Sequence, residues 1–184
     1  MSANRFVDAA CSLALSFAAL SASADVVVGG GAMFPRKNIV ENAVNSKDHT
    51  TLVAAVKAAG LVETLEGKGP FTVFAPVNAA FSALPAGTVD TLLKPENKAA
   101  LTKVLTYHVV PGRYTSSDLD KLIRNGNGTA MLKTASGGTL TFTKNGERNI
   151  TVRDETGAVA DISIYDVLQS NGVIFSVDRV LMPR

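Results

Sequence analysis

The chain has 184 residues, of which 46% are hydrophobic and 18% charged, and its formal net charge is +2. This length fits about one domain, and the apolar fraction excludes a wholly disordered chain. The small positive charge argues against a nucleic-acid partner, because nucleic-acid binders usually show a strong basic excess. One cysteine excludes an internal disulfide framework. No apolar run reaches the roughly 18 residues of a membrane-spanning helix, so we predict no membrane insertion.

The first 24 residues have the pattern of a signal peptide. An arginine precedes an apolar run over residues 9–20, and Ala22-Ser23-Ala24 follows as a small-x-small cleavage pattern. We therefore expect export to the periplasm, the cell surface or the extracellular medium, with a mature chain that begins at Asp25. Because an aspartate offsets the arginine, a buried or amphipathic N-terminal helix remains an alternative. A lipid anchor at Cys11 is disfavoured by the charged residue three positions earlier.

A glycine-rich segment opens the mature chain. Residues 25–37 hold three valines followed by Gly29-Gly30-Gly31, without the Gly-Lys-Ser/Thr of a phosphate-binding loop. We expect a flexible N-terminal arm over residues 25–37, followed by a single domain over residues 38–184.

Helix signals dominate the next part of the chain. Asn38 and Glu41 form a capping box, and Asp48 can cap a second helix that ends at Gly60. Further helices are predicted at residues 78–84, 88–93, 95–107 and 117–124, with Asn78, Thr88 and Ser117 as N-caps, and strands at residues 71–75 and 109–110.

From residue 129 onward the pattern changes to short strands. Residues 139–144 alternate apolar and polar side chains, Asn145-Gly146 is a hairpin signal, and residues 149–153 form the returning strand. Two more strands are expected within residues 159–167 and 173–181. A helix-rich first part followed by an antiparallel second part predicts an α+β domain.

The polar residues form no visible catalytic or metal-binding pattern. Neither His49 nor His108 has a metal-ligand spacing, and His49 beside Asp48 is expected to be solvated near a helix start. Asp118 and Asp120 lack the other ligands of a calcium loop and are expected to favour the positive end of their own helix. We therefore predict no enzyme activity, no metal and no cofactor.

Three segments resemble the signature segments of the fasciclin family of secreted cell-adhesion domains. They are residues 72–81, residues 105–110 with the Tyr107-His108 pair, and residues 171–183. A single such domain behind a signal peptide is similar to the bacterial members. The resemblance implies a fasciclin-like α+β fold, an antiparallel β-wedge with a helix-rich N-terminal half, and a monomer.

The resemblance also implies roles for individual residues. Structural roles are expected for Phe74, Pro76, Asn78, Phe81, Asn171 and Gly172. Tyr107 and His108 are implied to form a hydrogen-bonded structural pair near an adhesion surface, and both a structural role and direct partner contact stay open. Asp166-Val167 matches an Asp-Ile pair through which some animal members bind integrins, with a plain strand-end carboxylate as the alternative. Phe175 stands where the family often has histidine, and we expect it in the core.

The function implied by the resemblance is that of a secreted or surface-exposed adhesion module. It would bind a cell-surface protein or glycan without catalysis, through a shallow exposed patch. The alternative is a periplasmic carrier of a small ligand, which predicts a deep apolar pocket with a few polar groups. A hydrolase is disfavoured because no nucleophile and base stand out in the sequence.

Overall fold

The computed structural model describes residues 26–147 and 149–184, so the expected signal peptide lies outside the described residues. The helices are α1 (Ile39–Ala43), α2 (Thr50–Ala59), α3 (Val62–Glu66), α4 (Asn78–Ser82), α5 (Thr88–Leu92), α6 (Lys98–Tyr107) and α7 (Ser116–Asn125), with 3-10 turns at Lys47–His49 and Pro95–Asn97. The strands are β1 (Val26–Val28), β2 (Gly31–Met33), β3 (Phe71–Pro76), β4 (Val109–Pro111), β5 (Thr129–Lys133), β6 (Thr139–Asn145), β7 (Asn149–Arg153), β8 (Val159–Gln169) and β9 (Gly172–Val177).

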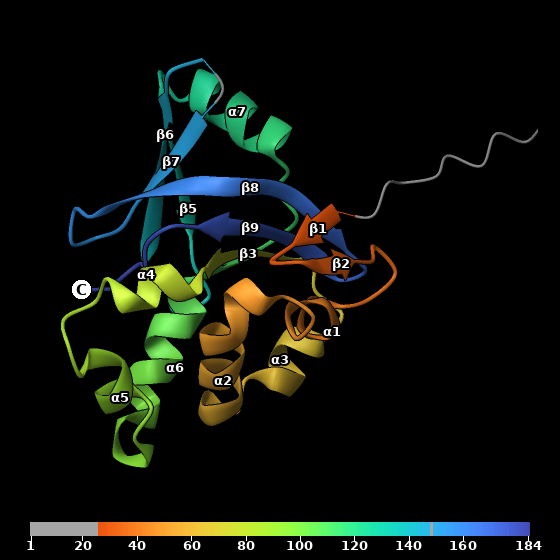
Figure 1. The fold of residues 1–184 in the computed structure, drawn as a ribbon. Helices are drawn as coiled ribbons and strands as arrows, with labels where there is room; N and C mark the ends of the chain where they lie inside the picture. The colour runs from red at the N-terminus through yellow and green to blue at the C-terminus, as the bar shows by residue number, and fades with distance from the viewer. Residues whose placement is uncertain (1–25, 148) are drawn as a thin grey trace, which may run out of the picture.

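The helices are divided between two ends of the molecule. Figure 1 shows α1 to α6 gathered below strands β3, β8 and β9, while α7 lies at the opposite end beside β6 and β7. The α+β class predicted from the sequence is confirmed, with most helices in the N-terminal half. The long strand β8 extends across the molecule and joins the two ends.

One sheet of seven strands carries the fold, in the order β4-β3-β9-β8-β7-β6-β5. Its pairings are antiparallel except for β3 with β9, which run parallel with Phe74 opposite Phe175. The sheet is thus mostly antiparallel, and the expectation of a wholly antiparallel wedge is corrected for this one pair. Because β3 and β9 lie about a hundred residues apart, no hairpin fixes their relative direction, and both are almost fully buried, as parallel strands usually are.

The segment expected to be a flexible arm instead contains a β-hairpin. Val28 pairs with Gly31, so Gly29 and Gly30 form a two-residue turn. Both glycines have positive φ, which a type I′ hairpin turn requires of its two central residues. Val28 and Met33 are 4% and 3% exposed and pack against the helices. Residues 26–33 therefore belong to the folded body, because the turn lets two apolar side chains reach the core.

Several helix starts differ from the predicted ones. The capping box of Asn38 and Glu41 and the left-handed end of α2 at Gly60 are confirmed. The N-caps of the α-helices expected to start at Asp48, Asn78, Thr88 and Ser117 are instead His49, Val77, Gly87 and Thr115. Asn78 shows one reason for such an error, because its side chain bonds to Thr51 and Lys47 instead of capping its own helix.

Two large clusters of buried side chains form the core. The helix-side cluster lies between α1, α2, α3, α6 and the sheet, and is mainly aliphatic. The strand-side cluster lies between α7 and the sheet, includes residues of strands β3 to β9, and holds Phe74, Phe142 and Phe175. The ring of Phe74 lies 5.5 Å from that of Phe175 and 5.2 Å from that of Phe142, measured between centroids. The expected core position of Phe175 is confirmed.

Candidate functional site

Tyr107 and His108 lie at the end of α6 with exposed fractions of 0% and 2%. The Tyr107 hydroxyl donates to the carbonyl of Thr139 at 2.9 Å and accepts from the amide of Glu155 at 2.9 Å. The Tyr107 side chain thus bonds to Thr139 of β6 and to Glu155 after β7 rather than to His108. Burial raises the pKa of Tyr107 to about 12.

The His108 ring joins α6 to the end of the chain. Its Nε2 accepts from the amide of Leu181 at 2.9 Å, so Nδ1 carries the proton and donates to the carbonyl of Val104 at 2.8 Å. Burial lowers the pKa of His108 to about 4, and the ring is neutral at pH 7. Of the two roles left open for the pair, this geometry favours the structural one, because neither side chain can reach a partner in this conformation.

Asn171 and Gly172 fix the approach of β9 to the helices. The side-chain carboxamide of Asn171 donates to the backbone carbonyls of Leu65 and Gly67 at 2.7 and 2.8 Å. Its oxygen accepts from the backbone amide of Ile39 at 3.0 Å. A Cβ at position 172 would lie 2.1 Å from the carbonyl oxygen of Phe71, which leaves room only for glycine. These contacts agree with the structural roles expected for both residues.

The signature residues of the first segment also act in the framework. The Asn78 carboxamide accepts from the amide of Thr51 at 3.0 Å and donates to the carbonyl of Lys47 at 2.8 Å, so it caps α2 rather than its own helix. Phe74 is fully buried. Pro76 ends β3, and Phe81 packs half-buried against the helix-side cluster.

His49 is buried rather than solvated. It is 3% exposed, with Nδ1 2.8 Å from the Ser46 hydroxyl and Nε2 3.4 Å from that of Ser176. Burial lowers its pKa. The expectation of a solvated position was wrong because the turn at Lys47–His49 directs the ring under the sheet.

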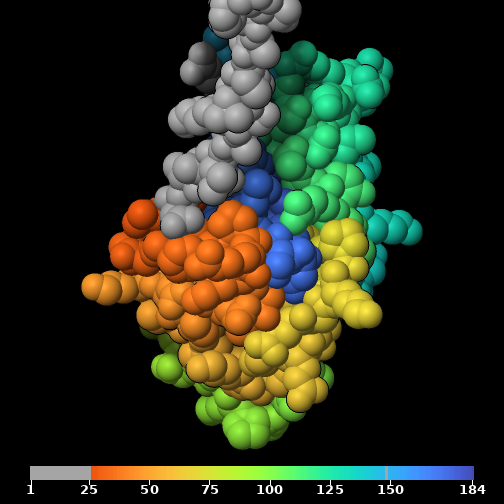
Figure 2. All heavy atoms as spheres, turned by 90° about the vertical axis from the view of Figure 1, so that its right-hand side faces the viewer, coloured from red at the N-terminus to blue at the C-terminus, as the bar shows by residue number. Residues whose placement is uncertain are grey.

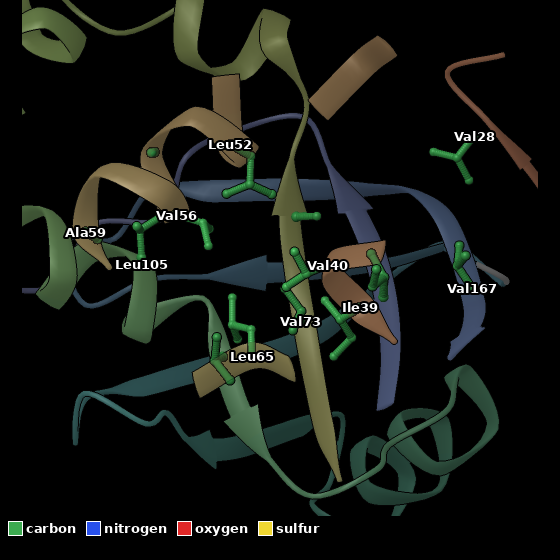
Figure 3. Packing of buried hydrophobic residues seen from close by; sticks show 14 of the residues in the cluster. Val28, Ile39, Val40, Leu52, Val56, Ala59, Leu65, Val73, Leu105 and Val167 are labelled. Carbon is green, nitrogen blue, oxygen red and sulfur yellow. The ribbon is translucent and has the colours of Figure 1, made fainter. Parts of the chain in front are cut away.

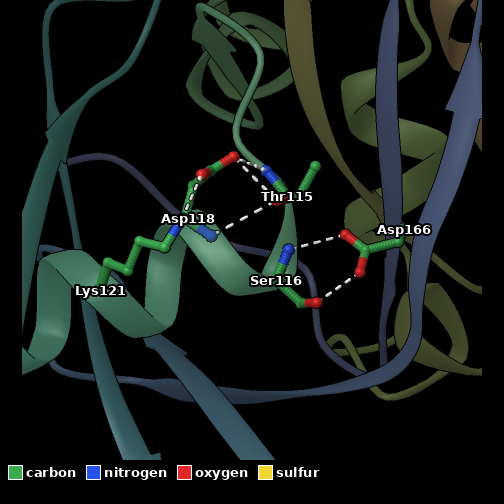
Figure 4. A network of polar contacts seen from close by, with 5 residues as sticks. All are labelled: Thr115, Ser116, Asp118, Lys121 and Asp166. Carbon is green, nitrogen blue, oxygen red and sulfur yellow. Dashed lines mark hydrogen bonds and ion pairs between the residues drawn. The ribbon is translucent and has the colours of Figure 1, made fainter.

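Asp166 and Val167 point in opposite directions at an irregularity of β8. Asp166 has a φ of +53° and its carboxylate accepts from the Ser116 amide at 2.6 Å and from the Ser116 hydroxyl (Figure 4). Val167 is 1% exposed in the helix-side cluster. Of this pair, only the half-buried Asp166 borders the surface, where it interacts with the positive N-terminal end of α7. Figure 2 shows the blue C-terminal part of the chain at the surface between the orange N-terminal segment and the green chain.

A second carboxylate, that of Asp118, caps the N-terminal end of α7. Thr115 and Asp118 form a capping box, in which the Asp118 carboxylate accepts from the Thr115 amide and hydroxyl at 3.0 and 2.8 Å. These bonds, first from the backbone, lower the pKa of Asp118. Lys121 lies 3.8 Å away on the exposed face (Figure 4). The N-terminal end of α7 is thus capped by Asp118 and joined to β8 through the bond between Ser116 and Asp166.

A polar cleft of about 420 Å³ opens beside this helix start. Its walls come from α7, from the β6–β7 hairpin and from β8. The lining residues are Ser116, Ser117, Asp120, Arg124, Lys144, Glu147, Asn149, Ile150 and Tyr165. We call this feature the polar cleft.

Charged groups are paired within the polar cleft. Asp120 contacts Arg124, and its other oxygen lies 2.7 Å from the Lys144 ammonium. The hydrogen bond from Lys144 is the main cause of a lowered pKa at Asp120. The Tyr165 hydroxyl accepts from the amide of Ile150 at 2.9 Å, and its ring packs edge-on against Phe175 at 6.0 Å. The cleft therefore presents fixed hydroxyls, both signs of charge and one aromatic ring.

Within residues 26–147 and 149–184, no three histidine, cysteine, aspartate or glutamate side chains gather as a metal site would require. In the same part of the chain, no helix has the length and apolar character needed to span a bilayer.

Residues 47–183 match the fasciclin domain. This chain belongs to the fasciclin family. It is 47% identical to "Protein sll1483" of Synechocystis over 157 residues, which cover 85% of this chain and 79% of that one. It is 37% identical to "Cell surface glycolipoprotein MPB83" of Mycobacterium bovis over 146 residues, covering 77% of this chain and 58% of that one.

The fold is also similar to a solved fasciclin structure. A domain pair from the insect cell adhesion molecule Fasciclin I matches with a TM-score of 0.71 and 17% identity, over 86% of this chain and 57% of that one. This likeness establishes the fold. The polar cleft of this fasciclin domain had no signal in the sequence, because its walls come from three segments that lie up to 50 residues apart.

Proposed function

We propose that this protein is an exported adhesion domain that binds a cell-surface protein or glycan through the polar cleft and the adjoining Asp166, without catalysis. The family supports a general role in adhesion, since the matching insect structure comes from the cell adhesion molecule Fasciclin I. The name of the mycobacterial relative supports a location at the cell surface. Periplasmic and extracellular locations are the alternatives.

The observation that carries this proposal is the polar cleft itself, whose walls are tied to the rest of the fold by hydrogen bonds and a ring contact. Asp166 anchors α7 through Ser116, and Tyr165 fixes the opposite wall through Ile150 and Phe175. A rigid wall needs little ordering when a partner binds, so more of the contact free energy contributes to affinity. Arginine and tyrosine are also the residue types that most often dominate protein interfaces.

The absence of catalysis is supported by the positions of the two histidines. Both are buried and use their ring nitrogens in structural contacts. Neither can serve as a general base for Ser116 or Ser117 in the polar cleft. The Ser116 hydroxyl donates to the Asp166 carboxylate, which also accepts from the Ser116 amide, and we propose that the hydroxyls of the cleft act as hydrogen-bonding groups.

The proposal is tested by cell attachment to surfaces coated with the purified protein. Arg124→Ala removes a cation of the polar cleft, whereas Lys121→Ala removes an exposed cation of the same helix outside it. We expect attachment of Arg124→Ala to be several-fold weaker than that of the wild type, which we expect to be a monomer. Attachment of Lys121→Ala should equal that of the wild type. Equal attachment of all three, or equal attachment of heat-denatured protein, would contradict the proposal.

The chemical class of the partner can be separated in the same assay. Target cells are treated either with protease or with periodate, which oxidises glycans. Loss of attachment after protease alone identifies a protein partner, and loss after periodate indicates a glycan.

A further inference from the structure

We infer that the helix-side cluster contains a binding site for a small, uncharged, apolar molecule of about the size of a benzene ring. The site is distinct from the polar cleft and does not depend on the proposed adhesion function. It rests on a cavity of about 100 Å³ between the helices and the sheet.

The wall of this apolar cavity is formed by side chains from both layers. Leu52 and Val56 of α2 and Leu105 of α6 face Val73 of β3, with Ile39 and Leu65 closing the sides (Figure 3). All six are at most 8% exposed. Side chains that border an empty space lack contacts on that side, so a molecule that fills it gains dispersion contacts without displacing a neighbour.

Water is a poor occupant of this space. A buried water needs two to four polar partners, and cavities lined by aliphatic side chains stay dry even at about 150 Å³, where benzene or xenon can enter instead. The aliphatic wall offers no such set of partners. Apolar ligands therefore meet little competition from water.

The histidines in the wall carry no charge at neutral pH. His49 and His108 direct their nitrogens to Ser46, Ser176 and backbone groups. The buried part of the wall offers no counter-charge, so an anion or a cation would have to give up its hydration there, which costs several kcal/mol or shifts its pKa. The cavity therefore selects uncharged ligands.

Part of the cavity wall is exposed to solvent. Three of its lining residues are exposed: Lys57 of α2, Thr64 of α3 and Ala135 between β5 and β6. Helix α3 has only five residues and is flanked by Gly60 and Gly67. Its C-terminal end is held by the Asn171 side chain, which donates to the carbonyls of Leu65 and Gly67, so we infer that a ligand enters beside the exposed lining residues rather than through α3.

Binding is tested with benzene as the ligand and with benzoate and benzylammonium as charged analogues. Benzene at about ten times its Kd should raise the Tm of the purified protein by about 3–5 °C, and neither charged analogue should do so. In NMR spectra, benzene should shift the methyl signals of Leu52, Val56 and Val73 while those of Val152 and Leu140 stay in place. No Tm increase, or shifts of equal size in both clusters, would overturn the inference.

Cavity-filling variants provide the matched comparison. Val56→Phe and the smaller change Val56→Leu add atoms to the space, whereas Val152→Leu adds the same methylene to the strand-side cluster. We expect the benzene response to be lost in Val56→Phe, reduced in Val56→Leu and retained in Val152→Leu. An undiminished response in a folded Val56 variant would show that benzene binds elsewhere and overturn the site. If Val56→Phe does not fold, the Val56→Leu titration decides the question.

Discussion

The strand-side cluster brings three phenylalanine rings into contact, whereas the helix-side cluster is aliphatic and encloses a cavity of about 100 Å³. The difference follows from the elements that meet in each region. Paired strands hold large rings at fixed spacing, so the rings can fill the space between sheet and α7. The helix side is covered partly by α1 and α3, which have five residues each and supply few side chains apiece. Short helices thus border a cavity, whereas the side chains of the extended strands bring three aromatic rings into contact.

The largest expected effect of this difference concerns removal of a core side chain. Phe74→Ala should lower the free energy of unfolding by about 3–5 kcal/mol, because a ring in contact with two others cannot be replaced by small movements. Leu52→Ala should cost about 2 kcal/mol, at the low end for leucine, since a side chain that borders the cavity has fewer contacts to lose. Urea denaturation of both variants measures the two values. A larger loss for Leu52→Ala would contradict the contrast in packing.

The pH dependence of stability follows from the histidine that joins α6 to the end of the chain. The pKa of His108 is about 4 in the folded protein and 6.5 in the unfolded chain. The unfolded state therefore binds the proton first, so stability is complete above pH 6.5 and falls as the pH decreases toward 4, by about 3 kcal/mol. The lowered pKa of His49 acts in the same direction.

Urea denaturation at a series of pH values measures this loss. His108→Gln removes the titrating group and should flatten the curve between pH 6.5 and 4 relative to wild type. An unchanged slope in a folded His108→Gln protein would show that other groups control the acid response.

A smaller loss is expected where β9 meets the helices. Asn171→Ala leaves the amide of Ile39 and the carbonyls of Leu65 and Gly67 without their side-chain partner. Unpaired buried groups of this kind should cost about 2–3 kcal/mol in total. Thermal unfolding beside the exposed Asn149→Ala measures the effect, and equal Tm values for the two variants would argue against a structural role for Asn171.

The smallest effect concerns the cap of α2. Asn78→Ala removes the acceptor for the Thr51 amide and should cost about 1 kcal/mol. Asn78→Asp keeps an acceptor at that position and should lose less. Chemical denaturation of both variants gives the order, and the reverse order would show that the donor bond to Lys47 matters more.

The sequence predicts the local elements of this fold well but not the contacts between them. The capping box at Asn38, the stop at Gly60 and the β6–β7 hairpin all depend on neighbouring residues, and all three are confirmed. The parallel pairing of β3 with β9 and the use of Asn78 to cap α2 depend on distant segments. No local pattern encodes those contacts.

The same limit applies to the candidate site. Asp166 was singled out by a family pattern, but its bond to Ser116 and the polar cleft beside it appear only when α7, the β6–β7 hairpin and β8 come together. Val167 illustrates the opposite case. It belongs to the same sequence pair, yet the irregularity of β8 turns it into the core.

The central claim is that the polar cleft binds the adhesion partner while the apolar cavity binds a small molecule. The most direct test measures cell attachment and the benzene-induced change in Tm for Arg124→Ala and Val56→Phe in parallel. The account predicts that Arg124→Ala loses attachment and keeps the benzene response. It predicts that Val56→Phe keeps attachment and loses the benzene response. Loss of attachment in a folded Val56→Phe protein, with full attachment of Arg124→Ala, would contradict it.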